Sequence, residues 1–262
     1  MERDEYQSQF LNRLELNSFE ERFPWLGGDL QTLRDTFVVE KLPKENAEII
    51  KIPIPKSPCG YFKKGYLLAL LDLPIDLNKI RGLVLMVHGL GGSSRRQGLR
   101  RMSFALREAG FAVLRLNLRG ADPGREYAGG TYSAKCNSDL IPAIVFAKKL
   151  CKSLEEKMKN KKNIPLFGVG LSLGGTILLN ACLESSQPIH SKDLLLDGLV
   201  CISSPLDLDY CSESIERPRN RFYQNWLLRR LVRQTFADPF GLIDSEKELL
   251  LSFTSQNKQI FS

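Results

Sequence analysis

The chain has 262 residues, of which 43% are hydrophobic, and its formal net charge is +7. This length and composition allow one full-sized hydrophobic core, and nothing in the sequence indicates a second independent domain. Because the positive charge is modest and partly local, it argues against a dedicated nucleic-acid-binding protein. No run reaches the roughly 18 apolar residues of a membrane span, and the charged N-terminus has no apolar signal region, so we expect a cytoplasmic protein.

Six cysteines and two histidines are the residues that could form disulfides or bind a metal. The cysteines show no C-x-x-C spacing, and the histidines lie far apart, so we expect reduced thiols and no metal site. The stretch 168–174 lacks the third glycine of a dinucleotide-binding motif, and the Walker lysine is absent as well. We therefore expect no organic cofactor.

The first part of the chain predicts an arm followed by an antiparallel pair of strands. Residues 1–35 are polar with scattered aromatic side chains, and we expect them to lie on the domain surface. Residues 36–54 and 64–72 are strand-like and are interrupted by turn residues. The run GLVLMV at 82–87 is continuously apolar, which is typical of a parallel strand buried on both faces.

Strands and helices alternate from this point onward. Residues 99–109 and the segment that Asp139 can cap have the apolar spacing of helices. Residues 112–116, 165–169 and 198–203 are short apolar runs typical of buried strands. The succession predicts a parallel sheet between layers of helices, with its ligand site at the carboxyl ends of the strands.

The motif Gly170-Leu171-Ser172-Leu173-Gly174 joins the strand at 165–169 to the next helix. A serine at a sharp strand-to-helix turn needs small residues two positions away on each side. Such a nucleophile elbow would lift the Ser172 hydroxyl above the sheet and place the Leu173 N–H beside a developing oxyanion. The motif alone could also lie in an ordinary loop, but the strand before it and the helix after it favour the elbow.

Further motifs accompany this one. With the extended elbow motif they are GGDLQTL (27–33), HGLGGSS (88–94), NLRGADPG (117–124), TYSA (131–134), GVGLSLGG (168–175) and ISSPLDLDYCS (202–212). On these motifs, the segment from about Gly82 to Leu231 resembles the α/β-hydrolase superfamily, and within it the YheT-like branch of predicted esterases and lipases. The resemblance implies an α/β-hydrolase fold, with a mostly parallel central sheet flanked by helices and a helical cap insertion. We accordingly divide the chain into an N-terminal arm (1–35), a hydrolase core (36–210) and a cap segment (211–262).

The resemblance also implies a function and a set of site residues. Ser172 would be the nucleophile of a carboxylesterase or lipase that acts on a small-molecule or lipid ester through an acyl-enzyme. The backbone N–H groups of Leu90 and Leu173 would form the oxyanion hole, and His88 and Gly89 would support the oxyanion loop.

The family's catalytic aspartate and histidine follow the cap, at positions that this chain does not reach. We therefore expect the last strands of the sheet to be missing, the strand at 198–203 to form an apolar edge, and activity to be impaired. His190 is expected at the far end of the elbow helix, away from Ser172. The alternative is a non-catalytic binding or scaffold protein of the same fold. The candidate acids Asp122, Asp139, Asp207 and Asp209 all precede the position of the family's acid.

Residues 217–235, RPRNRFYQNWLLRRLVRQT, contain six arginines and no acidic residue. Their apolar side chains recur at helical spacing, which predicts an amphipathic helix with a basic flank. This helix could be a cap that packs over the site with its arginines in solvent. It could also make a peripheral contact with an anionic membrane, and both roles can coexist in one enzyme.

Overall fold

The computed structural model describes residues 13, 19–38, 41–55, 65–158, 163–185 and 196–256. The chain forms two compact units, Met1–Leu42 and Pro43–Ser262. In the first unit, helix α2 (Gly28–Phe37) has Asp29 in its first turn and Arg34 in its last turn, an order that suits the helix dipole. The sequence-based expectation of a strand beginning at residue 36 is therefore wrong at its start, because residues 36 and 37 continue this helix.

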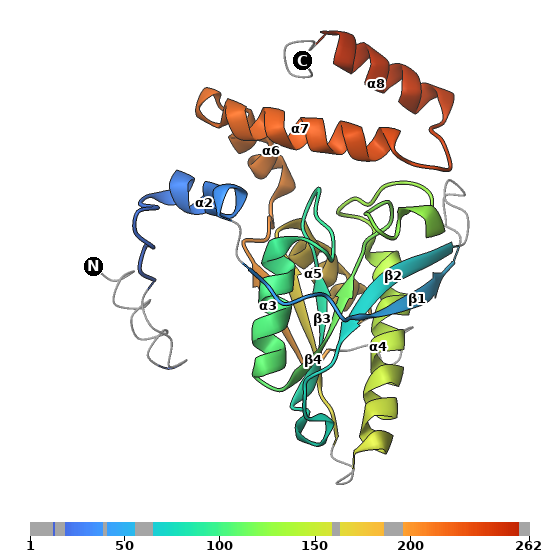
Figure 1. Ribbon diagram of the computed structural model, residues 1–262. Coiled ribbons are helices and arrows are strands. Elements are labelled where there is room, and N and C mark those ends of the chain that lie inside the picture. Colours follow the sequence, from blue (N-terminus) through green and yellow to red (C-terminus); the bar gives the residue numbers. More distant parts are fainter. Residues whose placement is uncertain are drawn as a thin grey trace. The chain divides into compact units, whose positions relative to one another are not determined.

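The second unit is built on a six-stranded sheet with the order β1-β2-β4-β3-β5-β6 (Figure 1). Strand β2 pairs antiparallel with both β1 and β4, whereas β4, β3, β5 and β6 run parallel. The predicted antiparallel start and parallel centre are thus confirmed. The strands are β1 (Glu48–Ile54), β2 (Gly65–Asp72), β3 (Gly82–Val87), β4 (Phe111–Leu116), β5 (Leu166–Leu171) and β6 (Gly198–Ile202).

Helices cover both faces of the sheet. Successive side chains of β3 pack alternately against the helices of one face and of the other. Leu83 and Leu85 belong to the core cluster that α4 and α5 complete, whereas Val84 and Met86 pack with Leu99 of α3. Side chains of a strand point alternately to opposite faces, so β3 is buried on both sides. The covering helices are α3 (Gln97–Glu108), α4 (Asn137–Lys157) and α5 (Leu173–Ser185), and short 3-10 turns lie at Leu77–Lys79 and Arg125–Tyr127.

The residues after β6 form helices, as the sequence predicted for the cap segment. They are α6 (Leu208–Glu216), a 3-10 turn (Pro218–Asn220), α7 (Arg221–Phe236) and α8 (Asp244–Gln256). Figure 1 shows these helices beyond one end of the sheet. Two hydrogen bonds connect them to core loops: Arg230 Nη2 donates to Gly91 O (2.5 Å), and Asp238 Oδ2 accepts from Gly130 N (2.6 Å). The cap therefore lies over the loops at the carboxyl ends of the strands.

Two local expectations from the sequence are corrected. Asp139 lies in the first turn of α4 but does not cap it, because the N-cap residue is Cys136 and no side chain bonds there. Strand β6 is not buried. It lies at the edge of the sheet, which confirms the apolar edge expected from the missing last strands, and Val200 and Ile202 are 55% and 38% exposed.

This edge generates a prediction about self-association. In the described ranges no strand pairs with the outer side of β6, so its N–H and C=O groups and its apolar side chains are available to another chain. We expect the protein to be dimeric or aggregation-prone, and Val200→Lys to shift it toward the monomer by placing a charge on the edge. Light scattering coupled to size-exclusion chromatography measures this.

Ile75→Lys is the matched control, because Ile75 is 91% exposed and lies outside the sheet. It should leave the mass distribution of the wild-type protein unchanged. A monodisperse wild-type monomer at moderate concentration would contradict the prediction.

Candidate active site

Ser172 occupies a one-residue turn between β5, which ends at Leu171, and α5, which begins at Leu173. Its φ angle is 49°, in the left-handed region that L-residues other than glycine rarely adopt. The turn is held by two backbone hydrogen bonds, from Ser172 N to Ile202 O (2.8 Å) and from Gly175 N to Ser172 O (2.9 Å). The serine is exposed, so its side chain is accessible at the carboxyl end of the central strands.

The glycines on each side of Ser172 are required by close packing. A Cβ on Gly170 would collide with the backbone of Gly175, and a Cβ on Gly174 would collide with the carbonyl oxygens of Val87 and His88. Backbone cannot retreat as a flexible side chain can, so larger residues would force β5, α5 and the end of β3 apart. The G-x-S-x-G spacing is thus explained by contacts between these three elements.

The glycine-rich loop after β3 (residues 88–94, hereafter the 88–94 loop) lies directly against this turn. A Cβ on Gly89 would be 2.9 Å from Ser172 Cβ and 3.0 Å from Leu171 O. Gly89 O accepts hydrogen bonds from the Tyr132 hydroxyl (3.1 Å) and from His88 Nδ1 (2.8 Å). Gly89 is therefore fixed against the serine.

His88 is completely buried, and both of its ring nitrogens are in use. Because a carbonyl oxygen can only accept, Nδ1 carries the proton that is donated to Gly89 O, and Nε2 accepts from Leu118 N (3.2 Å). Burial lowers the pKa of His88 from 6.5 to about 4, since desolvation penalises the imidazolium. The imidazole is thus a neutral support of the loop, and it has no free lone pair with which to take a proton from Ser172.

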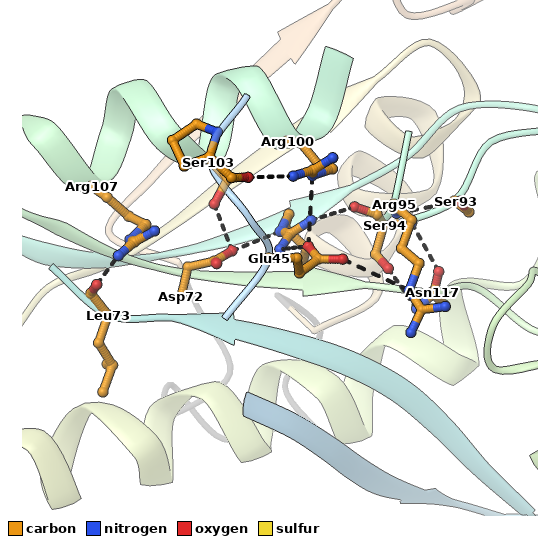
Figure 2. A network of polar contacts seen from close by, with 12 residues as sticks. Glu45, Asp72, Leu73, Ser93, Ser94, Arg95, Arg100, Ser103, Arg107 and Asn117 are labelled. Atoms are coloured by element: carbon orange, nitrogen blue, oxygen red, sulfur yellow. Dashed lines mark hydrogen bonds and ion pairs between the residues drawn. The ribbon is translucent and has the colours of Figure 1, made fainter. Parts of the chain in front are cut away.

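The far end of the 88–94 loop is held by Arg115 of β4 and by Asn117, the residue that follows β4. Figure 2 shows Asn117 close to Ser94 in this network of polar contacts. Arg115 is 2% exposed and donates from Nη1 to Ser94 O (2.6 Å) and from Nε to Asp72 Oδ2 (2.7 Å). Its third contact is an ion pair of Nη2 with Glu45 Oε1 (2.5 Å). A buried guanidinium needs such partners, because an unpaired charge in the interior is very unfavourable.

Asn117 completes the anchor. Its Oδ1 accepts from Ser94 N (2.9 Å), and its Nδ2 donates to Ser94 Oγ (2.9 Å) and to Leu68 O (3.1 Å). Ser94 and Asn117 are 0% and 1% exposed. These bonds satisfy the polar groups of a buried loop end, which fixes its position relative to the sheet.

Arg119 fixes the next loop in the same manner. It forms a two-pronged ion pair with Asp139, from Nε to Oδ2 (2.9 Å) and from Nη2 to Oδ1 (2.8 Å), and it also donates to Gly129 O (3.2 Å). The pair is buried and joins the loop after β4 to α4. Asp139 is therefore occupied as the partner of Arg119 and is not positioned as an acid for Ser172.

Leu90 and Leu173, the two residues whose N–H groups are expected to form the oxyanion hole, line one cavity of about 310 Å³. Its walls are mainly apolar, and α7 lines it from the cap side. Burial raises the pKa of Tyr132, which also lines it, to about 12, so the hydroxyl stays protonated as a donor. The other lining residues are Thr131, Ser133, Leu231, Gln234 and Thr235.

The remaining candidate acids and bases lie elsewhere. The Asp207 carboxylate caps α6 by accepting from Tyr210 N (2.9 Å), Asp209 is in the first turn of that helix, and Asp122 lines a separate basic cavity. His190 lies outside the described residues. Within the described ranges the Ser172 hydroxyl forms no side-chain hydrogen bond, and no three His, Cys, Asp or Glu side chains gather as metal ligands.

Sequence reasoning assigned no role to Tyr132, Arg115 or Asn117. Tyr132 and Asn117 fall in the quoted motifs TYSA and NLRGADPG, but their partners lie 43 and 23 residues away in sequence. Arg115 carried a weak signal of its own, since it is the charged residue inside the apolar strand β4. A charge at a strand centre indicates a buried partner but does not identify it.

The fold and this site define a class of protein: an α/β sheet that carries a serine at a tight strand-to-helix turn under a glycine-rich loop. The model of the alpha/beta hydrolase family matches residues 84–256, more than half of the chain. The chain belongs to this family.

Relatives are similar over parts of the chain. A protein of Escherichia coli (strain K12) named "Putative esterase YheT" is 40% identical over 67 residues, which are 26% of this chain and 18% of the relative. The match thus spans less than a fifth of that relative's length.

Among solved structures, XC6422 of Xanthomonas campestris, described as a serine hydrolase without a lid, shows 20% identity and a TM-score of 0.44 over 63% of this chain and 65% of its own. A monoglyceride lipase of Saccharomyces cerevisiae shows 24% identity and a TM-score of 0.43 over 57% of this chain and 46% of its own.

No helix among the described residues is both long enough and apolar enough to cross a bilayer.

The burial of His88 predicts a pH dependence of stability. The pKa is about 4 in the folded protein and near 6.5 when the chain is unfolded, so between these values only the unfolded state takes up the proton. The contribution is fully present above pH 6.5 and is lost as the pH falls to 4, amounting to about 3 kcal/mol. Urea unfolding of the wild type and His88→Gln across this range measures it.

Carboxylates titrate in the same range in both proteins, so the difference between the two pH profiles isolates His88. The free energy of unfolding should fall more steeply with decreasing pH in the wild type than in His88→Gln. Parallel profiles would show that His88 titrates normally and is not buried as a neutral ring.

Proposed function

We propose that the protein is a serine hydrolase of the carboxylesterase or lipase type, with Ser172 as its nucleophile. The observation that carries this proposal is the strained turn at Ser172. Its φ angle is 49°, and its exposed side chain lies next to Gly89 of the 88–94 loop. Residues held in unfavourable backbone conformations persist only where the surrounding structure enforces them, and they cluster at functional sites. Membership of the alpha/beta hydrolase family and the similarity to an esterase-named relative support the same reaction class.

In the proposed reaction the Ser172 oxygen attacks the carbonyl carbon of an ester. The carbonyl oxygen becomes an oxyanion, and the N–H groups of Leu90 and Leu173 stabilise it, together with the positive end of α5. The intermediate collapses to an acyl-enzyme on Ser172, and the alcohol leaves with the proton that the serine lost. Water then hydrolyses the acyl-enzyme, which releases the acid and restores the hydroxyl.

The base for these proton transfers is not among the described residues that contact Ser172. His88 has both nitrogens engaged, and Asp139 and Asp207 serve Arg119 and the start of α6. A serine hydrolase deprived of its triad partners retains about 10³ to 10⁴ of rate enhancement over water, from the oxyanion hole and binding. We therefore propose that this chain hydrolyses its ester substrate only slowly.

The second candidate is a non-catalytic binding or scaffold protein of the same fold. This candidate is favoured because both ring nitrogens of His88 are already hydrogen-bonded, so His88 cannot act as the base. A neutral serine without a base is a weak nucleophile. In this case the cavity beside Leu90 and Leu173 would bind a ligand without transforming it.

Labelling with a fluorophosphonate probe separates the two candidates. An activated Ser172 should be labelled in the folded protein, and Ser172→Ala should abolish both the labelling and any hydrolysis of p-nitrophenyl butyrate. The substitution should leave folding intact, because the exposed hydroxyl makes no core contact.

Ser203 provides the matched control, since it is exposed, follows β6 and has the same φ angle of 49°. Ser203→Ala should be labelled as the wild type is. Labelling that survives Ser172→Ala would remove Ser172 from the mechanism, and folded wild-type protein that resists labelling would support the scaffold.

A further inference from the structure

A second cavity, of about 710 Å³, lies between the 88–94 loop and α7, and it is strongly basic. Gly91, Gly92 and Ser93 line it from the loop, and Gln234 and Ala237 from the cap. Among the described residues that line it, Asp122 is the one carboxylate, and it is exposed to solvent. The cationic lining residues come from three separate segments of the chain: Arg95, Arg96, Arg125, Arg230 and Arg233.

Few of these charges are neutralised by the protein. Arg95 lies 3.8 Å from Glu45, whereas Arg125 and Arg230 donate to the backbone carbonyls of Gly120 and Gly91. Within the described ranges no carboxylate forms an ion pair with Arg96, Arg125, Arg230 or Arg233. Like charges gathered in one concave site repel one another and create a positive potential that attracts anions.

The basic cavity adjoins the apolar cavity of the candidate active site. Gln234 of α7 lines both, and the chain passes from Leu90, which lines the apolar cavity, to Gly91, which lines the basic one. A molecule that occupied both would need an apolar part beside Leu90 and Leu173 and an anionic part beside the arginines. This pairing of chemistries within two adjacent cavities defines a class of ligand.

We propose that the basic cavity binds the phosphate or carboxylate group of an ester substrate whose apolar part lies in the neighbouring cavity. Calling this molecule a substrate rests on the proposed hydrolase function, whereas its binding to the two cavities does not require turnover. The planar guanidinium group suits such oxyanions because it donates two parallel hydrogen bonds to them. Arg230 is already oriented by its bond to Gly91 O and by the ring of Trp226, 4.6 Å from its Cζ.

This assignment gives a role to part of the basic segment 217–235. Arg230 and Arg233 line the cavity together with arginines from other segments, so a discrete anionic group inside it accounts for their position. A membrane contact would need arginines that present their charge to a flat surface. The anionic group could belong to a free metabolite-sized molecule or to a lipid headgroup, and the experiment separates these two sources.

The test uses calorimetric titration with hexyl phosphate, inorganic phosphate and 1-hexanol. Hexyl phosphate should bind more tightly than either of the others, because it alone fills both cavities. In the double variant Arg96→Gln/Arg233→Gln its affinity should fall by at least about tenfold, as expected for charge-assisted hydrogen bonds. Both arginines are exposed, so the double substitution should leave folding intact.

The matched control is Arg221→Gln/Lys152→Gln, which removes two exposed positive charges outside the basic cavity. It should bind hexyl phosphate within twofold of the wild type. Equal weakening in both double variants would overturn the proposal, because it would show attraction to net charge alone. Binding of hexyl phosphate no tighter than that of 1-hexanol would overturn it as well.

Vesicles distinguish the source of the anionic group. Anionic phospholipid vesicles that the wild type binds in a manner dependent on Arg96 and Arg233, but not on Arg221 and Lys152, would identify a lipid headgroup. Binding of hexyl phosphate without vesicle binding would identify a free molecule, and both results support the cavity. Ser172→Ala should bind hexyl phosphate as the wild type does, so failed probe labelling with intact binding would overturn the hydrolase function and leave the anion site standing.

Discussion

The position of the 88–94 loop against the turn at Ser172 is the constraint on which the rest of the site depends. Polar groups fix the loop at both of its ends. His88 and Tyr132 hold Gly89 O at one end, and Arg115 and Asn117 hold Ser94 at the other. Because the side chains that make these contacts are buried, a side chain that lost its bond would leave a polar group unsatisfied, at a cost of about 1–3 kcal/mol. The loop is therefore preorganised rather than shaped by a ligand.

This preorganisation explains why the strained conformation of Ser172 persists. A non-glycine residue at positive φ costs of order 1–3 kcal/mol, and here the packing of Gly89, Gly170 and Gly174 against neighbouring backbone enforces it. The same arrangement brings Leu90 and Leu173 to one apolar cavity and places Gly91 at the edge of a basic one. One anchored loop thus connects the proposed chemistry to the proposed recognition of an anionic group.

The sequence predicted the elements whose signals are local. Short, mainly apolar runs predicted β3, β4 and β5, and the G-x-S-x-G spacing predicted the turn at Ser172, because both follow from backbone geometry and near neighbours. The apolar run at 198–203 by itself predicted a buried strand, since such a run does not reveal whether a neighbour covers it, and only the expected absence of the last strands predicted the exposed edge that β6 forms. The roles of Arg115 and Tyr132 depend on contacts between distant segments, which spacing in one sequence does not encode.

Hydrogen exchange of individual backbone amides tests the anchored loop most directly. The Ser94 and Leu118 amides lie outside the strands, yet they donate to buried side-chain acceptors, Asn117 Oδ1 and His88 Nε2. Amides that open only with the sheet exchange at the rate of global unfolding, whereas amides of mobile loops exchange with little protection. The account predicts that both amides are protected as strongly as those of β3 and β4. Exchange at the rate of an unprotected loop would contradict it.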